Sequence, residues 1–424
     1  MKLFPTLAAL IALTAPATLT AAPFCDALAD VEQLPKKYAK RGPFHADAAS
    51  GWVVGEDQLK ASFTVTEETT ALWSALREAF ATRGAQLVVL AAPPRPLFAP
   101  EGVVPANRDL DALQAGFSAY IEALNAAGIP APDLTQALSV DVAEDYYFAR
   151  DTHWTPKGAA WSSVELATLM GQMPPSLEDL PFAETYSEKG SLSAVVEKVC
   201  GTRPVAEETV APIYASVGGA AALLGDAGDP TVALVGTSFS DRYQTDAYQV
   251  AGALSWALGA DVQNVSLTGG GLVGAMSGFI QSGALEQGQF QTVVWETPYT
   301  NPLTQIAGLR QILGALEASE NQTEIYAGPL NGDWQAIALG AEVSEDGSLV
   351  IETPGITAGT LIVELWSADK TKLRLKLRKS DRLEADLRSD VWHVSLAALP
   401  IADVARVKIK LDGDANAARV MLTN

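Results

Sequence analysis

The stretch Thr231-Val-Ala-Leu-Val-Gly-Thr-Ser-Phe-Ser240 decides the fold that we expect for this chain. Its apolar run predicts a buried strand, and Gly236 predicts a tight turn directly after that strand. A hydroxyl in such a turn is presented at the carboxyl edge of a parallel sheet, where α/β folds bind their ligands. Ser238 is therefore our strongest candidate for a nucleophile.

A second segment, Asp151-Thr-His-Trp154, offers the partners that a serine nucleophile needs. An Asp and a His separated by one residue in extended backbone point to the same side of the chain. Asp151 then holds one tautomer of His153, and His153 acts as general base for Ser238. These residues form a Ser-His-Asp triad that is recognised by roles and not by chain order.

The Asp-x-His pattern also has an explanation that requires no catalysis. Thr155 before Pro156 suits the cap of a helix, and Gly-Thr-Ser is an ordinary strand-to-helix turn. We favour the triad because the other two histidines are poorly placed for one. His45 lies in an irregular segment and His393 lies inside a predicted strand.

Helix and strand patterns alternate around these two segments, which favours an α/β fold with a parallel sheet and helices on both faces. We expect this domain to span residues 23–322. Residues 174–230 match no clear pattern, and Gly269–Gly271 is expected to be a flexible turn. Strands are predicted at 51–55, 86–91, 231–235, 262–267 and 292–295, and a short strand with a turn within 129–138. Helices are predicted at 67–83, 109–127, 156–170, 246–259 and 302–318.

The pattern changes after about residue 323, where helical periodicity is lost. Short alternating runs separated by turn residues are typical of an all-β sandwich. We expect this second domain to span residues 323–424. Its predicted strands are 348–352, 359–366, 372–378, 391–395, 404–411 and 419–422.

Charge restricts the partners of the chain. The formal net charge of −21 argues against nucleic acid. From residue 331 onward, 12 Lys and Arg face 14 Asp and Glu, so nearly all of the excess negative charge lies earlier in the chain. The C-terminal region is thus the plausible docking surface for a polyanion.

The N-terminus indicates export. Lys2, the apolar run Leu3–Leu13 and the small residues up to Ala22 predict a secretory signal peptide over residues 1–22. The two cysteines of an exported chain, Cys25 and Cys200, then predict a disulfide, with two unrelated buried thiols as the alternative. No metal site and no cofactor are expected, because neither a cluster of metal-ligating residues nor a phosphate-binding glycine motif is present.

Several residues near strand ends are candidates for sugar contacts. Arg95 follows the strand at 86–91 and is a candidate to bind a carboxylate or a hydroxyl. Tyr299 and Tyr243 follow two other strands and are candidates to stack on a sugar or to hydrogen-bond to it. Surface exposure explains Arg95, and half-buried packing explains the tyrosines, equally well. Asn264 and the Gly269–Gly271 turn are candidates for an oxyanion hole, beside backbone N–H groups near Ser238.

One predicted C-terminal strand carries alternating basic residues. Lys372, Arg374, Lys376 and Arg378 alternate with leucines, so the basic side chains share one face. Such a face suits an anionic polysaccharide, with Trp366, Trp334 or Trp392 stacking on sugar rings. The alternative is a sandwich with a basic outer face and tryptophans in its core.

The segments Asp151-Thr-His-Trp-Thr-Pro156 and Gly236-Thr-Ser-Phe-Ser240 resemble the AlgX/AlgJ family of periplasmic alginate O-acetyltransferases. The order also matches, with Asp-His before Ser. The export signal, one cysteine near residue 25 and a β-rich C-terminal region are similar to the AlgX-like branch. The resemblance covers about residues 23–424 and is specific at the two motifs.

This resemblance implies an SGNH-hydrolase-like, flavodoxin-like catalytic domain and a C-terminal carbohydrate-binding module in the periplasm. It implies that Ser238 accepts an acetyl group from a membrane or periplasmic donor partner and passes it to an anionic polysaccharide, alginate or a similar polymer. We expect a monomer. Two alternatives stay open: a carbohydrate acetylesterase with the same triad, and a non-catalytic polysaccharide-binding scaffold of an export complex.

Overall fold

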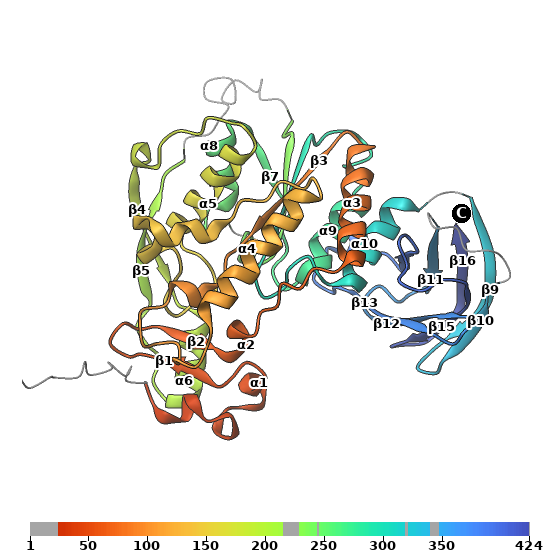
Figure 1. Ribbon diagram of the computed structural model, residues 1–424, viewed down its shortest axis with the longest axis horizontal. Helices are drawn as coiled ribbons and strands as arrows, with labels where there is room; N and C mark the ends of the chain where they lie inside the picture. Colours follow the sequence, from red (N-terminus) through yellow and green to blue (C-terminus); the bar gives the residue numbers. More distant parts are fainter. Residues whose placement is uncertain (1–23, 215–228, 244–245, 319–320, 340–346, 424) are drawn as a thin grey trace, which may run out of the picture.

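The computed structural model describes residues 24–214, 229–243, 246–318, 321–339 and 347–423, so the predicted signal peptide lies outside the described residues. A four-stranded parallel sheet with the strand order β3-β8-β6-β7 occupies the centre of the larger part of the molecule (Figure 1). The predicted parallel sheet is confirmed. Its strands are β3 (Gln86–Ala91), β8 (Thr292–Thr297), β6 (Val232–Val235) and β7 (Val262–Asn264).

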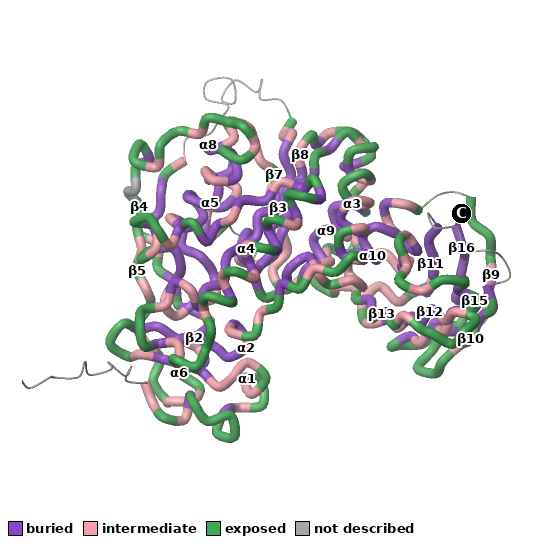
Figure 2. The backbone as a smooth tube through the Cα atoms, in the orientation of Figure 1, coloured by how far each residue is buried: buried purple, intermediate pink, exposed green. Residues whose placement is uncertain are grey.

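Helices cover both faces of this sheet, as expected. Alternate strand residues point to opposite faces, so that Leu87 and Val89 enter one apolar core while Val88 and Leu90 enter another. The central strands are largely buried (Figure 2). One face is covered by α3 (Glu67–Ala81), α4 (Leu110–Ala126), α9 (Gly271–Gln281) and α10 (Ile306–Glu317), and the other by α5 (Pro156–Leu169) and α8 (Val250–Leu258).

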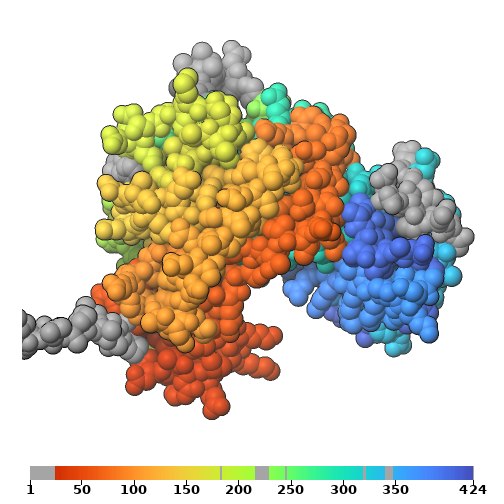
Figure 3. Space-filling model, in the orientation of Figure 1, coloured from red at the N-terminus to blue at the C-terminus, as the bar shows by residue number. Residues whose placement is uncertain are grey.

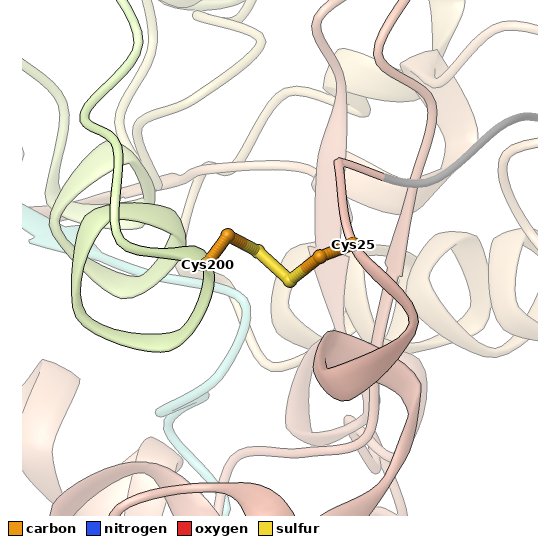
Figure 4. The surroundings of a disulfide bond; sticks show 2 residues. All are labelled: Cys25 and Cys200. Carbon is orange, nitrogen blue, oxygen red and sulfur yellow. A yellow bond between two sulfur atoms is a disulfide. The ribbon is translucent and has the colours of Figure 1, made fainter.

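The N-terminal elements pack on a helix from the middle of the chain. Cys25 and Cys200 form the predicted disulfide (Figure 4), which joins the start of the described chain to the end of α6. Leu28, Phe44 and Val195 belong to the small apolar core beside it. The elements involved are α1 (Lys36–Ala39), β1 (Phe44–Ala46), β2 (Val53–Gly55), α2 (Glu56–Leu59) and α6 (Ser191–Cys200).

The structure differs from two of the sequence predictions and assigns one segment that they left open. The short strand predicted within 129–138 is absent; Pro130 accepts one hydrogen bond from Val89 but has no N–H to continue a ladder. Residues 174–230, which we left unassigned, contain α6 and an antiparallel pair, β4 (Phe182–Glu188) and β5 (Glu207–Pro212). The glycine turn at 269–271 leads directly into α9, a helix that the sequence analysis missed.

The C-terminal region contains two four-stranded antiparallel sheets that enclose a third apolar core. All six predicted strands are confirmed, and β9 and β10 are added to them; the domain boundary at 322/323 stays a prediction. The sheet β10-β15-β12-β13 comprises β10 (Gln335–Ala338), β15 (Val404–Leu411), β12 (Gly359–Ser367) and β13 (Lys372–Lys379). The sheet β14-β11-β16-β9 comprises β14 (Val391–Ser395), β11 (Ser348–Glu352), β16 (Ala415–Thr423) and β9 (Gln322–Leu330).

Helix α10 fixes the C-terminal sheets to the α/β part. The side chain of Arg310 on α10 is fully buried and donates to the carbonyls of Ser395 at 3.0 Å and Ala397 at 2.7 Å. A Cβ at Gly314 would lie 2.7 Å from the backbone nitrogen of Ser395, so only glycine permits this approach.

The blue C-terminal region and the red N-terminal segment stand on either side of a hollow in Figure 3.

Candidate active site

The turn that carries Ser238 is hydrogen-bonded to a carboxylate of the neighbouring strand. Glu296 on β8 is fully buried and accepts hydrogen bonds from the backbone N–H of Thr237 at 2.6 Å and from the Ser240 hydroxyl at 3.2 Å. A Cβ at Gly236 would lie 2.4 Å from the Glu296 Oε2 atom, which explains the glycine. Thr237 and Ser240, which lie on either side of Ser238 and Phe239, are therefore both hydrogen-bonded to the Glu296 carboxylate.

His153 lies against this turn. Its Nε2 atom is 2.8 Å from the Ser238 Oγ atom, within the reach that proton transfer requires. The indole N–H of Trp154 donates to the backbone carbonyl of Phe239 at 3.0 Å. This hydrogen bond joins the segment that contains His153 to the segment that contains Ser238. Helix α5 begins directly afterwards, where the Thr155 side chain caps it by accepting from the N–H of Gly158 at 3.1 Å. The segment therefore does both things that the sequence suggested: Thr155 caps a helix, and His153 contacts Ser238.

Asp151 is the third member of this hydrogen-bonded chain. It is fully buried, and one of its oxygens is hydrogen-bonded to the His153 Nδ1 atom. Its other oxygen accepts from the N–H of Ser191, the first residue of α6, at 2.6 Å. Because α6 ends at Cys200, the disulfide and the orientation of Asp151 depend on the same helix.

Neighbouring side chains keep the Asp151 carboxylate ionised. Burial opposes its charge, but the adjacent His153 and Arg242 outweigh burial and hold the pKa of Asp151 well below its usual range. Arg242 lies 3.6 Å from Asp151 and donates to Glu188 at 3.0 Å, while Tyr248 stacks on the His153 ring with centroids 5.0 Å apart. The sequence analysis missed these three neighbours, because nothing local links them to the Asp-x-His motif.

Ser238 and His153 border a cavity of about 570 Å³. Tyr299, predicted as a sugar contact, also lines this cavity, and its hydroxyl is buried without a hydrogen-bond partner among the described residues. Gly269 and Gly271 line it as well, so their backbone N–H groups and that of Ser238 are the candidate oxyanion donors. Asn264 does not line this cavity, and its amide donates to the carbonyl of Ser240 at 2.7 Å.

Arg95 was wrongly predicted as a sugar contact. Its side chain is fully buried and donates to the carbonyls of Val53 at 2.8 Å and Phe148 at 2.9 Å. Arg95 therefore stabilises the loop before Asp151 through its hydrogen bonds and does not line the Ser238 cavity. Tyr243 is 75% exposed and does not line the cavity that contains Ser238.

A second cavity of about 740 Å³ adjoins the first, since both are lined by Gly269, Gly271 and Asn301. Lys376 and Arg378 of β13 line this second cavity. The predicted basic strand thus borders the same groove as Ser238.

The remaining predicted binding residues lie on the outer face of the same sheet. Arg374 pairs with Glu364 at 3.5 Å and is 5.6 Å from the Trp334 ring centroid. Trp366 has three cations within 5.2 Å of its ring centroid. Two of them, Arg406 and Lys408, belong to β15, and the sequence analysis did not single them out.

No group of three His, Cys, Asp or Glu side chains suited to a metal ion occurs in the part of the chain that the structure describes. Within the same residues, no helix is long and apolar enough to span a membrane.

A family model described as the SGNH hydrolase-like domain of acetyltransferase AlgX matches residues 50–299. The chain belongs to the AlgX family. The matched AlgX domain includes Asp151, His153 and Ser238, together with the cavity wall at Tyr299.

Named relatives agree with this assignment. Alginate biosynthesis protein AlgX of Pseudomonas syringae pv. tomato is 26% identical over 388 residues, which cover 86% of this chain and 80% of that protein. The probable alginate O-acetylase AlgJ of the same organism is 32% identical over 248 residues, or 54% of this chain and 61% of that protein. The solved structure of Pseudomonas aeruginosa AlgX matches 94% of this chain and 99% of that chain with a TM-score of 0.68 at 22% identity, and so shows the same fold.

Proposed function

We propose that this protein is a polysaccharide O-acetyltransferase that moves an acetyl group through Ser238 to a hydroxyl of an anionic exopolysaccharide, alginate or a similar polymer. The observation that carries the proposal is the 2.8 Å contact between the Ser238 hydroxyl and His153, whose other ring nitrogen is bonded to Asp151. Membership of the AlgX family supports the reaction class, and the names of the relatives suggest the polymer.

The first half of the reaction loads the serine. Ser238 Oγ attacks the carbonyl carbon of a donor acetyl ester while His153 Nε2 takes the hydroxyl proton. The bond from the acetyl carbon to the donor oxygen then breaks, and that oxygen leaves with the proton from His153. Asp151 stays ionised, orients the ring and stabilises the imidazolium that forms between these two steps.

The second half transfers the acetyl group to the polymer. His153 takes a proton from an acceptor hydroxyl, whose oxygen attacks the acetyl carbon on Ser238. The bond to Ser238 Oγ breaks, and Oγ regains a proton from His153. The cavity of about 570 Å³ in front of Ser238 is of a size that accommodates sugar residues.

The basic outer face of the C-terminal sheet is the proposed docking surface for the polymer. Lys376 borders the groove next to the Ser238 cavity, and Arg374 and Trp366 continue the basic face along β12 and β13. An anionic chain bound there has its next residues beside the reacting groups. Export to the periplasm and a separate acetyl-donor protein complete the proposal.

The proposal is tested by incubating the mature protein with a chromogenic acetyl ester and a polyuronate oligosaccharide. We expect acetylated oligosaccharide from the wild type and none from Ser238→Ala. Ser266→Ala, which changes a hydroxyl outside the cavity lining, is the matched control and should retain transfer. Persistent transfer by Ser238→Ala would refute the assignment of Ser238. Ester cleavage without acetylated oligosaccharide in the wild type would favour an acetylesterase that uses water as the acceptor.

A further inference from the structure

We propose that Arg41 and the Tyr299 hydroxyl form a subsite in the Ser238 cavity that binds the carboxylate of a uronic acid residue of the acceptor. This inference rests on the proposed acetyl transfer, because it concerns how the acceptor sugar is recognised at the reacting serine. Arg41 was not among the residues that the sequence indicated.

Arg41 enters the cavity from the N-terminal segment, far from Ser238 in sequence. Its Nε atom donates to Asp57 at 3.1 Å, and its side chain is 32% exposed. The backbone N–H of Asp57 also donates to the carbonyl of Arg41 at 3.2 Å, so the two residues hold one another. The Arg41 side chain is thus anchored through one edge.

The other edge of the guanidinium is left for a ligand. Within the described part of the chain, neither terminal nitrogen of Arg41 has a hydrogen-bond partner. Two parallel N–H groups of the two terminal nitrogens match the two oxygens of a carboxylate, whereas the Nε–H group is already used by Asp57. The two terminal nitrogens of Arg41 therefore suit a bidentate contact with an anion.

Tyr299 supplies a second donor among the residues that line this cavity. Its side chain is 2% exposed, and its hydroxyl is buried with no hydrogen-bond partner among the described residues. Tyr299, Arg41 and Asp57 line the same cavity. Burial raises the pKa of Tyr299, so the hydroxyl keeps its proton and donates. A buried donor without a partner costs free energy until a ligand accepts from it.

The charge of the cavity favours a carboxylate over a more highly charged group. Among the described residues that line the cavity, Arg41 is the one permanent cation, and Asp57 already offsets part of its charge. A single carboxylate matches that balance better than a phosphate does. A uronic acid carries its carboxylate and its hydroxyls on one ring, so anchoring the carboxylate at Arg41 holds a hydroxyl of the same or the adjacent sugar toward Ser238.

The test compares a short polyuronate oligosaccharide with the same oligosaccharide after its carboxylates have been reduced to alcohols. The readout is the ratio of kcat/KM for the two acceptors, with a chromogenic acetyl ester as donor. We expect the wild type to prefer the carboxylated acceptor by about 10- to 100-fold, the range of a charge-assisted bidentate contact. Arg41→Met should bring the ratio close to one, and Arg41→Lys, which retains charge without the fork, should give an intermediate ratio.

Arg83→Met is the matched control. Arg83 also donates through Nε to a carboxylate, that of Glu286 at 3.3 Å, but it precedes β3 and so lies at the opposite edge of the sheet. Its ratio should equal that of the wild type. A wild-type ratio that survives Arg41→Met would overturn the subsite, as would an equal loss for both acceptors.

A binding measurement separates failure of the subsite from failure of the proposed reaction. We would titrate Ser238→Ala and the double variant Ser238→Ala/Arg41→Met with both oligosaccharides by calorimetry. Carboxylate-selective binding that requires Arg41, without any transfer by the wild type, rejects acetyl transfer and retains the subsite. Binding that does not depend on Arg41 rejects the subsite whether or not transfer occurs.

Discussion

Replacing Glu296 by Gln should remove a pH dependence of stability that the buried carboxyl imposes on the protein. Burial raises the pKa of Glu296 from 4.5 to about 7, although Thr237 and Ser240 donate to it. The folded state therefore binds this proton more tightly than the unfolded state does. The associated stability is complete below about pH 4.5 and is lost as the pH rises through about 7.

The size of the effect follows from this shift. A difference of about 2.5 pKa units corresponds to about 3 kcal/mol, most of which is lost between pH 5 and pH 8. Glu296→Gln is neutral throughout this range, and its amide oxygen can still accept from the Thr237 N–H. We therefore expect the variant to gain about 2 to 3 kcal/mol relative to the wild type as the pH rises from 5 to 8.

Urea unfolding at both pH values, followed by tryptophan fluorescence, measures this difference directly. Trp295 next to Glu296 is buried and reports on this part of the core. Glu286→Gln, on the surface and 49% exposed, is the control and should follow the wild type. Parallel stability curves for Glu296→Gln and the wild type would refute the reasoning, because they would mean that the hydrogen bonds to Glu296 fully compensate its burial.

Three further outcomes follow from the site and its supports. Asp151→Asn should lower kcat for acetyl-ester turnover by about 10³- to 10⁴-fold while circular dichroism stays unchanged, and a loss below tenfold would contradict its orienting role. Cys200→Ser should destabilise the protein by about 3 to 5 kcal/mol in urea, since the bridge closes a loop of 175 residues; an unchanged unfolding midpoint would contradict this. Lys376→Glu should weaken retention on immobilised polyuronate and flatten its salt dependence, whereas the same change at Lys36, on α1, should not.

The strand cores and the cluster of Asp151, His153 and Ser238 were predictable because their signals are local. The run at 231–235 and the run at 86–91 are buried strands, as their apolar composition indicates. Ser238, His153 and Asp151 each lie in a short motif at a strand or helix end, and parallel topology brings such ends to one edge of the sheet. The alternating sequence of β13 predicted correctly that its basic side chains lie on the outer face, because strand alternation is also a local signal.

The rest of the site depends on contacts between distant segments. Arg95 follows a strand at the expected edge, but the segments around Val53 and Phe148 cover it, and no local pattern reveals that cover. Arg41 shows the converse, because only tertiary packing brings its irregular N-terminal segment to the cavity. Helix α9 was missed because its first residue, Gly271, continues a glycine run that is typical of a turn.

The most direct test of the central claim is mass spectrometry of the protein after brief incubation with an acetyl ester and rapid acid quenching. The account predicts one added acetyl group on the peptide that contains Ser238, with no such adduct in Ser238→Ala. The adduct should disappear when a polyuronate oligosaccharide is added before the quench, and the acetyl group should then be found on the sugar. An acetyl group on another residue, or acetylated sugar formed by Ser238→Ala, would contradict the account.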